Sequence, residues 1–208
     1  NNTLTLGSAL NVLGSLSINA GTFDSGASNW SVIVTSDVNI TGGMFDLSGS
    51  TMAVGGSWNR TSGLFDAGTS TVIFNSGTTR NIRTGSDEFT NVMINGSGGL
   101  FNVQDILIST GNLTITAGTL DSNNYFLSVT SNVIINGGTL DLNNSSMTVG
   151  GNWSRTSGTF TAGNSSVTFN GAVNQNITSG SQSFYHVLVN KIAGTVSTSD
   201  NLDLGGNF

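Results

Sequence analysis

The chain repeats itself along its length, and this repeat limits its possible folds more than any other feature. Residues 55–63 read GGSWNRTSG and residues 150–158 read GGNWSRTSG, an offset of 95 positions. The same offset holds without a gap to the end of the chain, with about 25 of roughly 58 positions identical. Self-similarity of this kind is typical of solenoids and other repeat arrays. The sequence therefore predicts a single repeat domain over residues 1–208, made of two imperfect units of about 95 residues at about 4–98 and 99–208.

A shorter period lies inside each unit. Glycine, any residue, an apolar residue and then Asp or another small polar residue recur in that order. These motifs begin at Gly21, Gly43, Gly63, Gly99, Gly118, Gly138, Gly158 and Gly194. Most intervals are about 19 to 22 residues and two are about 36, which fits two turns each. We therefore expect one coil every 19–20 residues or so, and five coils of about 19 residues in each unit.

The pattern within one coil predicts short β-strands. After Gly138, three short stretches of strand-forming sequence fall at residues 139–141, 146–149 and 152–154, separated by turn residues. Period-two alternation with Gly and Asn between the stretches indicates strands, and no window shows helical spacing. The expected fold is all-β, a parallel β-helix (β-solenoid) of about ten to eleven coils and about 50 Å length. A right-handed coil is favoured because the strict six-residue period of left-handed coils is absent.

The apolar residue of the short motif is expected to build the core. Phe23, Phe45 and Phe65 recur in successive coils, so their side chains should stack inward in a row. Phe65 and Phe160 occupy matching positions of the two units, and both should be buried. Asn residues at the turns should hydrogen-bond to Asn residues of neighbouring coils, as in other stacked strands.

Composition excludes several classes of protein. The chain has no Cys, so it has no disulfide scaffold, thiolate zinc site or thiol nucleophile. Its net charge is -6 with only 5 Lys and Arg, which argues against nucleic acid as a partner. Hydrophobic residues make up 36%, too many for a disordered chain, yet no apolar run is long enough to insert in a membrane. The chain begins inside repeating sequence, so we expect a mature product or a piece of a longer protein.

One segment carries a family resemblance. Its parts are residues 150–153 (GGNW), Phe160, residues 166–171 (SVTFNG), 175–177 (QNI) and 184–190 (FYHVLVN). They resemble the β-solenoid repeats of very large secreted and cell-surface proteins of bacteria and archaea, including filamentous-haemagglutinin-like adhesins and extracellular filament proteins. The resemblance implies an extracellular stalk, filament or adhesin. It implies no catalytic residue, because the family shares none.

Catalysis is not expected, and no cofactor is expected either. Parallel β-helices also include polysaccharide-acting enzymes, which need clustered carboxylates and a base in a groove. The residues available here are Glu88, His186 and Lys191, which have no carboxylate partner nearby in the sequence that would complete an acid–base pair. An enzyme of that kind is therefore only a distant alternative.

The Asp of the short motif allows two interpretations. Three such carboxylates stacked at about 4.8 Å could hold Ca²⁺. Each Asp could instead accept hydrogen bonds from the backbone of its own turn, which we favour because the glycine-rich calcium nonapeptide is absent. The candidates are Asp24, Asp46, Asp66, Asp121 and Asp141.

Two further groups of residues suggest contacts with sugars. Trp58 and Trp153 have polar neighbours, so they should point inward rather than stack on a ligand. The sequence also contains about eleven Asn-x-Ser/Thr sequons, little more than composition alone would produce. Possible glycosylation sites include Asn29, Asn39, Asn59, Asn112, Asn152, Asn164 and Asn176.

The expected function is a non-catalytic structural role outside the cell, as a segment of a filament, fibre or stalk. The chain opens at Leu4 and closes at Phe208 in the body of a repeat, with no cap that the sequence reveals. We therefore expect self-association into filaments or continuation into a longer array. The alternative is an adhesin rod that presents a binding face to surface glycans or to host or cell-surface proteins.

Overall fold

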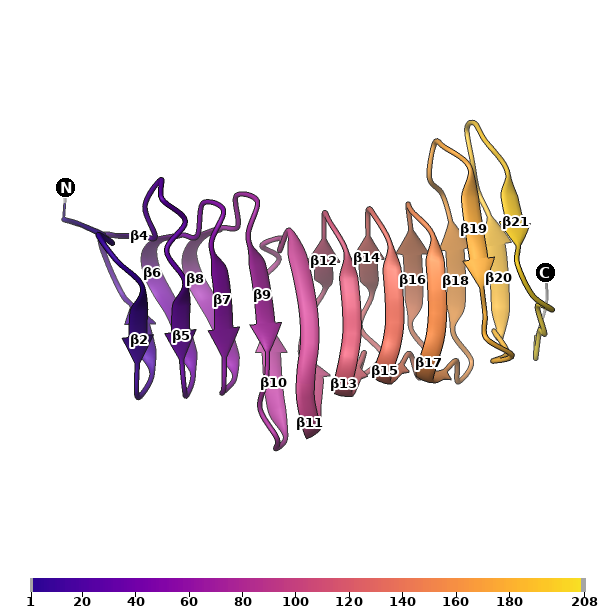
Figure 1. Ribbon diagram of the computed structural model, residues 1–208, viewed down its shortest axis with the longest axis horizontal. Coiled ribbons are helices and arrows are strands. Elements are labelled where there is room, and N and C mark those ends of the chain that lie inside the picture. The colour runs from indigo at the N-terminus through magenta and orange to yellow at the C-terminus, as the bar shows by residue number, and fades with distance from the viewer. Residues whose placement is uncertain (1, 207–208) are drawn as a thin grey trace.

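A computed structural model describes residues 2–206, which form a parallel β-solenoid of about ten coils with no helix in that range (Figure 1). All pairs of neighbouring strands are parallel and join successive coils. Each coil passes through three walls, which we name A, B and C in the order in which the chain passes through them from residue 10 onward. The predicted all-β solenoid is therefore confirmed.

Wall A runs the length of the rod. It contains β2 (Leu10–Val12), β5 (Val32–Val34), β7 (Thr51–Val54), β9 (Thr71–Phe74), the first parts of β11 (Asn91–Val103), β13 (Leu113–Asp121), β15 (Val133–Asp141) and β17 (Trp153–Thr161), and then β19 (Gln175–Thr178) and β21 (Val196–Thr198).

Walls B and C share the remaining strands. Wall B contains β3 (Leu16–Ile18), the first parts of β6 (Val38–Asp46) and β8 (Trp58–Asp66), β10 (Arg80–Arg83), and the last parts of β11, β13, β15 and β17. Wall C contains β1 (Thr3–Thr5), β4 (Thr22–Asp24), the last parts of β6 and β8, and then β12 (Leu107–Ser109), β14 (Leu127–Val129), β16 (Ser146–Val149), β18 (Ser166–Phe169) and β20 (His186–Val189).

The coil is right-handed, as the sequence favoured. In Figure 1 the strands β2, β5, β7 and β9 lie at the front and run downward, whereas β12, β14, β16 and β18 lie behind and run upward. The coils advance from left to right in the same view, which makes the turn right-handed.

Alternating side chains fill the interior with one continuous apolar core. In β11, for example, Val92 and Ile94 are buried while Met93 between them faces outward. Phe23, Phe45 and Phe65 stack as predicted, with ring centroids 5.1 and 5.7 Å apart, and Phe65 is only 5% exposed. Phe160 has the same exposure, so both expected core residues are confirmed. Because each coil covers the apolar side chains of the next, the core is formed by stacking and not within any one coil.

The two sequence units do not contain a whole number of coils. Four steps along wall A lead from β7 to β15, and the chain then crosses wall B before it reaches β16 in wall C. Since β16 is the counterpart of β7 at the 95-residue offset, one unit equals four and two-thirds coils. The expectation of five coils in each unit was wrong, because it used about 19 residues per coil, whereas the coils are longer, as the register pairs of Leu113 with Val133 and of Trp153 with Ile177 show. The unit boundary near residue 98 stays a prediction.

Candidate functional surfaces

The five candidate calcium ligands end strands and bond to the turns that follow. Their Oδ1 atoms accept the backbone N–H two residues further on, at 2.7 to 3.1 Å. The pairs are Asp24 with Gly26, Asp46 with Ser48, Asp66 with Gly68, Asp121 with Asn123, and Asp141 with Asn143. The aspartates form two columns along the rod. Asp46 pairs in register with Asp24 on one side and Asp66 on the other, and Asp121 pairs with Asp141. These backbone bonds are those of the turn role that the sequence favoured over calcium binding, and residues 2–206 contain no group of three or more His, Cys, Asp or Glu that could hold a metal.

Asparagine side chains join successive coils, as the sequence predicted. At the entry to wall A, the Asn112 Oδ1 accepts both the backbone N–H and the side-chain amide of Asn132, at 3.1 and 3.0 Å. The Asn132 Oδ1 accepts the Asn152 N–H, and the Asn152 Oδ1 accepts the Asn176 N–H, both at 2.8 Å. This ladder satisfies polar groups at a corner where the strand ladder begins.

All seven candidate glycosylation sites take part in bonds between coils. Asn39 accepts from the side chain of Asn59 at 3.2 Å, and Asn29 accepts from the N–H of Gly49 at 2.9 Å. Asn164 donates its side-chain amide to Asn144 at 3.0 Å. Glycosylation of these residues stays a prediction, and at Asn59, Asn164 and Asn176 a glycan would occupy the amide nitrogen that bonds a neighbouring coil.

A clamp that sequence reasoning missed holds the loop between walls B and C. The Arg60 guanidinium donates to the carbonyl oxygens of Gly85 at 2.5 Å and Gly63 at 2.6 Å. Its Nε lies 2.5 Å from the Asp87 carboxylate, which also accepts the Phe65 N–H at 2.7 Å. Asp87 thus supplies the acceptor that a strand of the next coil would otherwise present to Phe65.

The following coil supports the same loop from the other side. The Asp105 carboxylate accepts the N–H groups of Thr84 and Gly85, at 2.8 and 2.7 Å. Gly85 and Ser86 both have positive φ, at 61° and 72°, so the loop turns sharply and leaves these N–H groups without strand partners. The repeated Arg, Gly-Ser and Asp of both units were the signal that could have identified this clamp.

The second unit contains the same clamp without its ion pair. Arg155 donates to Gly180 at 2.5 Å and to Gly158 at 3.1 Å. The Gln182 Oε1 accepts the Phe160 N–H at 3.0 Å, in the place that Asp87 has in the first unit. Asp200 accepts the N–H of Ser179 at 2.9 Å, and this bond above all holds the pKa of the Asp200 carboxyl below its usual value.

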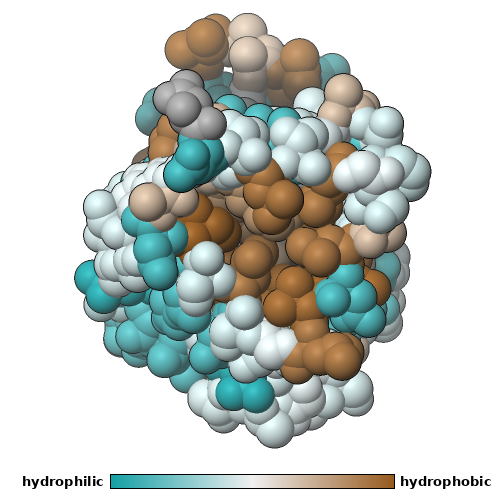
Figure 2. All heavy atoms as spheres, turned by 90° about the vertical axis from the view of Figure 1, so that its left-hand side faces the viewer, coloured by the Kyte–Doolittle hydropathy of each residue, from teal (hydrophilic) through white to brown (hydrophobic). Residues whose placement is uncertain are grey.

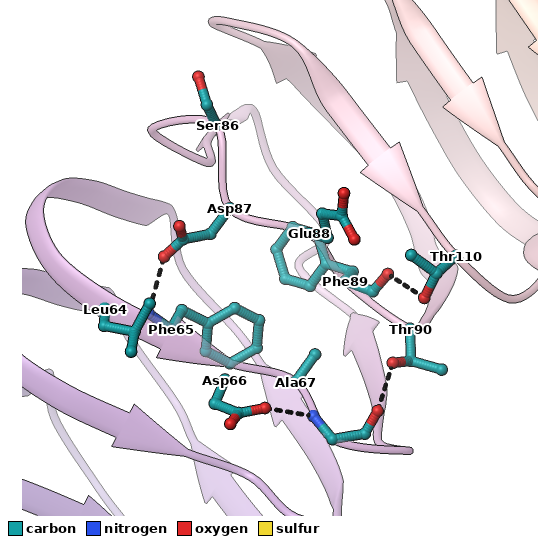
Figure 3. A pocket seen from close by; sticks show the side chains of 11 residues that line it. Leu64, Phe65, Asp66, Ala67, Ser86, Asp87, Glu88, Phe89, Thr90 and Thr110 are labelled. Atoms are coloured by element: carbon teal, nitrogen blue, oxygen red, sulfur yellow. Dashed lines mark hydrogen bonds between the residues drawn. The ribbon is translucent and has the colours of Figure 1, made fainter.

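A crevice of about 350 Å³ lies beside the first clamp (Figure 3). Asp66, Asp87 and Glu88 line it together with backbone and with Thr90, whose hydroxyl donates to Gly68 at 2.7 Å. Among the described residues, no His, Lys or Arg lines the crevice, although the Asp87 carboxylate at its edge is ion-paired with Arg60. In the second unit the three acidic positions are occupied by Thr161, Gln182 and Ser183, so this charge is not repeated.

The three residues considered for catalysis are not brought together. Glu88 lines the crevice, whereas His186 lies in β20, five coils or about 24 Å further along wall C. Lys191 binds the rod itself, since its Nζ donates to the Val173 carbonyl at 2.9 Å and to the Gln175 side chain at 2.6 Å. Trp58 and Trp153 are each 1% exposed, which confirms that they are core residues and not platforms for sugars.

At the N-terminal end of the rod, the apolar side chains of the core are exposed in cross-section (Figure 2). Apolar side chains gather at the centre of this end and polar ones surround them. A hollow of about 590 Å³ lies here, lined by Leu4, Leu10, Leu16 and Phe23 among others. Leu4 is 59% exposed and pairs in register with Phe23, as an uncovered core position would. Phe208, the expected partner at the other end, lies outside the described residues.

Comparison with known proteins assigns the chain to a family. A model of the haemagglutinin repeat matches residues 94–144 and 127–206, together more than half of the chain. A search of curated proteins and a search of solved structures found no match. Within residues 2–206 no helix is long and apolar enough to cross a membrane. The matched residues and the solenoid agree with the resemblance, and the chain belongs to the haemagglutinin repeat family.

Proposed function

We propose that this chain is a non-catalytic segment of an extracellular rod, such as a filament, fibre or stalk. Proteins with haemagglutinin repeats are typically secreted or located at the cell surface, and the family suggests an adhesin-like or filament-like segment. The observation that carries the proposal is the use of the polar side chains. The arginines of both clamps and Lys191 bond the backbone of neighbouring coils, and the turn aspartates bond the backbone of their own turns, so these side chains hold the rod itself together.

The apolar side chains at the N-terminal end of the described residues suit the stacking of coils. A further coil of the same kind, from this chain or from another copy, would cover the hollow and the Leu4 side chain. Stacking of that kind is open-ended, because each added coil presents the same type of end. The length of the rod would then be set by the number of stacked coils.

Microscopy of lengthened proteins tests this proposal. Each added 95-residue unit should lengthen the rod by about 22 Å, which is four and two-thirds coils at about 4.8 Å. Negative-stain images of proteins with two, four and six units should show straight rods of proportional length. Compact particles, or rods that do not lengthen, would contradict it. Antibody against the chain should also label intact source cells, and label confined to broken cells would exclude a surface location.

An adhesin is the second candidate, and the family match favours it. In that case the rod would present a face to surface glycans or to a protein of another cell. Binding of the folded chain to a glycan array or to intact cells would support this role. If the rods lengthen and assemble but bind neither, the structural role alone stands.

A further inference from the structure

One outer surface of the rod is uncharged and carries a row of side chains that are apolar except at Thr114. The row consists of the central outward residues of wall A: Ile33, Ala53, Ile73, Met93, Thr114 and Ile134. Direct register pairs connect each to the next, so the row is straight and spans six coils. Ile33 is 43% exposed and the others are half-buried. We call this row, with the outward residues on either side of it, the neutral face.

The flanking rows of the neutral face are polar but carry no charge. One side has Ser31, Thr51, Thr71, Asn91, Asn112 and Asn132, and the other has Thr35, Gly55, Asn75, Asn95, Thr116 and Asn136. None of the 5 basic and 11 acidic residues of the chain is among these positions. In a chain of net charge -6, the charge has been placed on the other surfaces.

The outward rows of the other walls differ. On wall C, Met44 and Leu64 are outward, but a column of Asp24, Asp46 and Asp66 runs beside them. Further along the same wall the row is Ile108, Ser128, Thr148, Thr168 and Leu188, in which three hydroxyl side chains separate the two apolar ones. Wall B presents Asn39 and Asn59. Among the described residues, wall A is where apolar side chains follow one another in four successive coils, Ile33, Ala53, Ile73 and Met93, with no charge beside them.

We propose that the neutral face is a lateral contact between two copies of this chain. Two chains of net charge -6 repel each other least where neither presents a carboxylate, which is at this face. A sheet face with a regular row every 4.8 Å or so complements itself, and faces of sheets pack about 10 Å apart. Sugar chains fit less well, because no aromatic ring lies on the face for them to stack on.

The area of the neutral face determines the strength of this contact. Six coils span about 24 Å and five residues of strand span about 17 Å, so each copy contributes about 400 Å². The total of about 800 Å² is below the 1,200 Å² or so of stable complexes. The contact is therefore weak and reversible at this length of rod, and it does not depend on stacking at the ends.

Disulfide trapping tests the proposal directly, because the chain has no cysteine of its own. Ile73 lies near the middle of the row. A two-fold contact therefore brings it close to Ile73 of the second copy if the rods are parallel, or to Met93 if they are antiparallel. The proteins are Ile73→Cys alone and an equal mixture of Ile73→Cys with Met93→Cys. The matched control is Thr168→Cys, at the equivalent outward position of the second unit, which lies on wall C.

At equal concentration of a few hundred micromolar, one of the two wall A samples should form covalent dimers about tenfold faster than the control. Equal rates in all three samples would overturn the proposal, even if the rods join at their ends. Sedimentation equilibrium gives a second readout on the chain with its sequence otherwise unchanged. Ile73→Thr keeps a strand-forming residue and should weaken the lateral association, whereas Thr168→Ile should not. Unchanged association of folded Ile73→Thr would also count against it.

Discussion

Trp58 and Trp153 occupy the same place in the two sequence units but lie in different walls of the rod. Trp58 pairs with Val38 and Ile82 in wall B, whereas Trp153 pairs with Val133 and Ile177 in wall A. Both indoles still pack on the phenylalanine seven residues later, at 4.8 and 4.7 Å between ring centroids. The two units thus share the same local packing, but the second unit is rotated about the rod axis by a third of a turn relative to the first. Three units, or 14 coils, would return an equivalent residue to the same wall.

Core phenylalanines should be far more sensitive than their outward neighbours. Phe65→Ala removes a ring that contacts Phe45, Trp58 and Phe89, and we expect a loss of about 3–5 kcal/mol of unfolding free energy. Leu64→Ala is the matched control, because Leu64 is 48% exposed and should cost under about 1 kcal/mol. Denaturant titration followed by circular dichroism measures both. Equal losses would show that the register of β8 is wrong.

The clamp of the first unit should tolerate the glutamine that the second clamp has in the same place. Asp87→Gln gives the first clamp the same residue type that the second clamp has at position 182. The glutamine can therefore still accept a hydrogen bond from the Phe65 N–H. Asp87→Ala leaves the Arg60 guanidinium and the Phe65 N–H without this acceptor, and it should lower the free energy of unfolding by about 1–3 kcal/mol. Chemical denaturation of the two variants compares them. A loss for Asp87→Gln as large as for Asp87→Ala would contradict the role we give to this side chain.

Asp200 should stabilise the fold above acid pH. Its folded-state pKa is lowered, chiefly by the Ser179 N–H, so the unfolded chain binds the proton more readily. The stability it contributes is complete above the unfolded pKa of about 4 and is lost as pH falls through the folded pKa. The melting temperature of Asp200→Asn should therefore lie below that of the unchanged chain at pH 6, and the difference should disappear at low pH. A difference that grows as pH falls would have the wrong sign.

Buried serines at the corners should divide into two groups. The Ser122 hydroxyl donates to the Leu142 carbonyl at 2.8 Å, so Ser122→Ala should cost about 1 kcal/mol. The Ser165 hydroxyl is buried with no hydrogen-bond partner among the described residues, and Ser165→Ala should be neutral or stabilising. Thermal unfolding of the two variants provides the comparison. Greater destabilisation by Ser165→Ala would show that its hydroxyl has a partner, such as bound water.

Much of the fold could be predicted because short-range pattern determines it. Period-two alternation marks the strands, and a phenylalanine in each of three successive coils marks the core row of Phe23, Phe45 and Phe65. The rotation of the units was not predictable in the same way. The short motif does not indicate the wall in which it lies. Coil length also varies, because the register step from Trp153 to Ile177 is longer than the step from Val133 to Trp153. The clamp was missed because its members are far apart in the sequence and meet only when coils stack.

The claim that most of this account depends on is the regular stack of coils, and distances between spin labels test it most directly. Each of three proteins carries two added cysteines with spin labels, one at Ile33 and the other at Ile73, Thr114 or Ser154. The two labels then lie two, four or six coils apart on wall A. Measured by pulsed electron paramagnetic resonance in an excess of unlabelled chain, the distance should increase by about 10 Å at each step. Three distances that do not increase evenly would contradict the stacked rod.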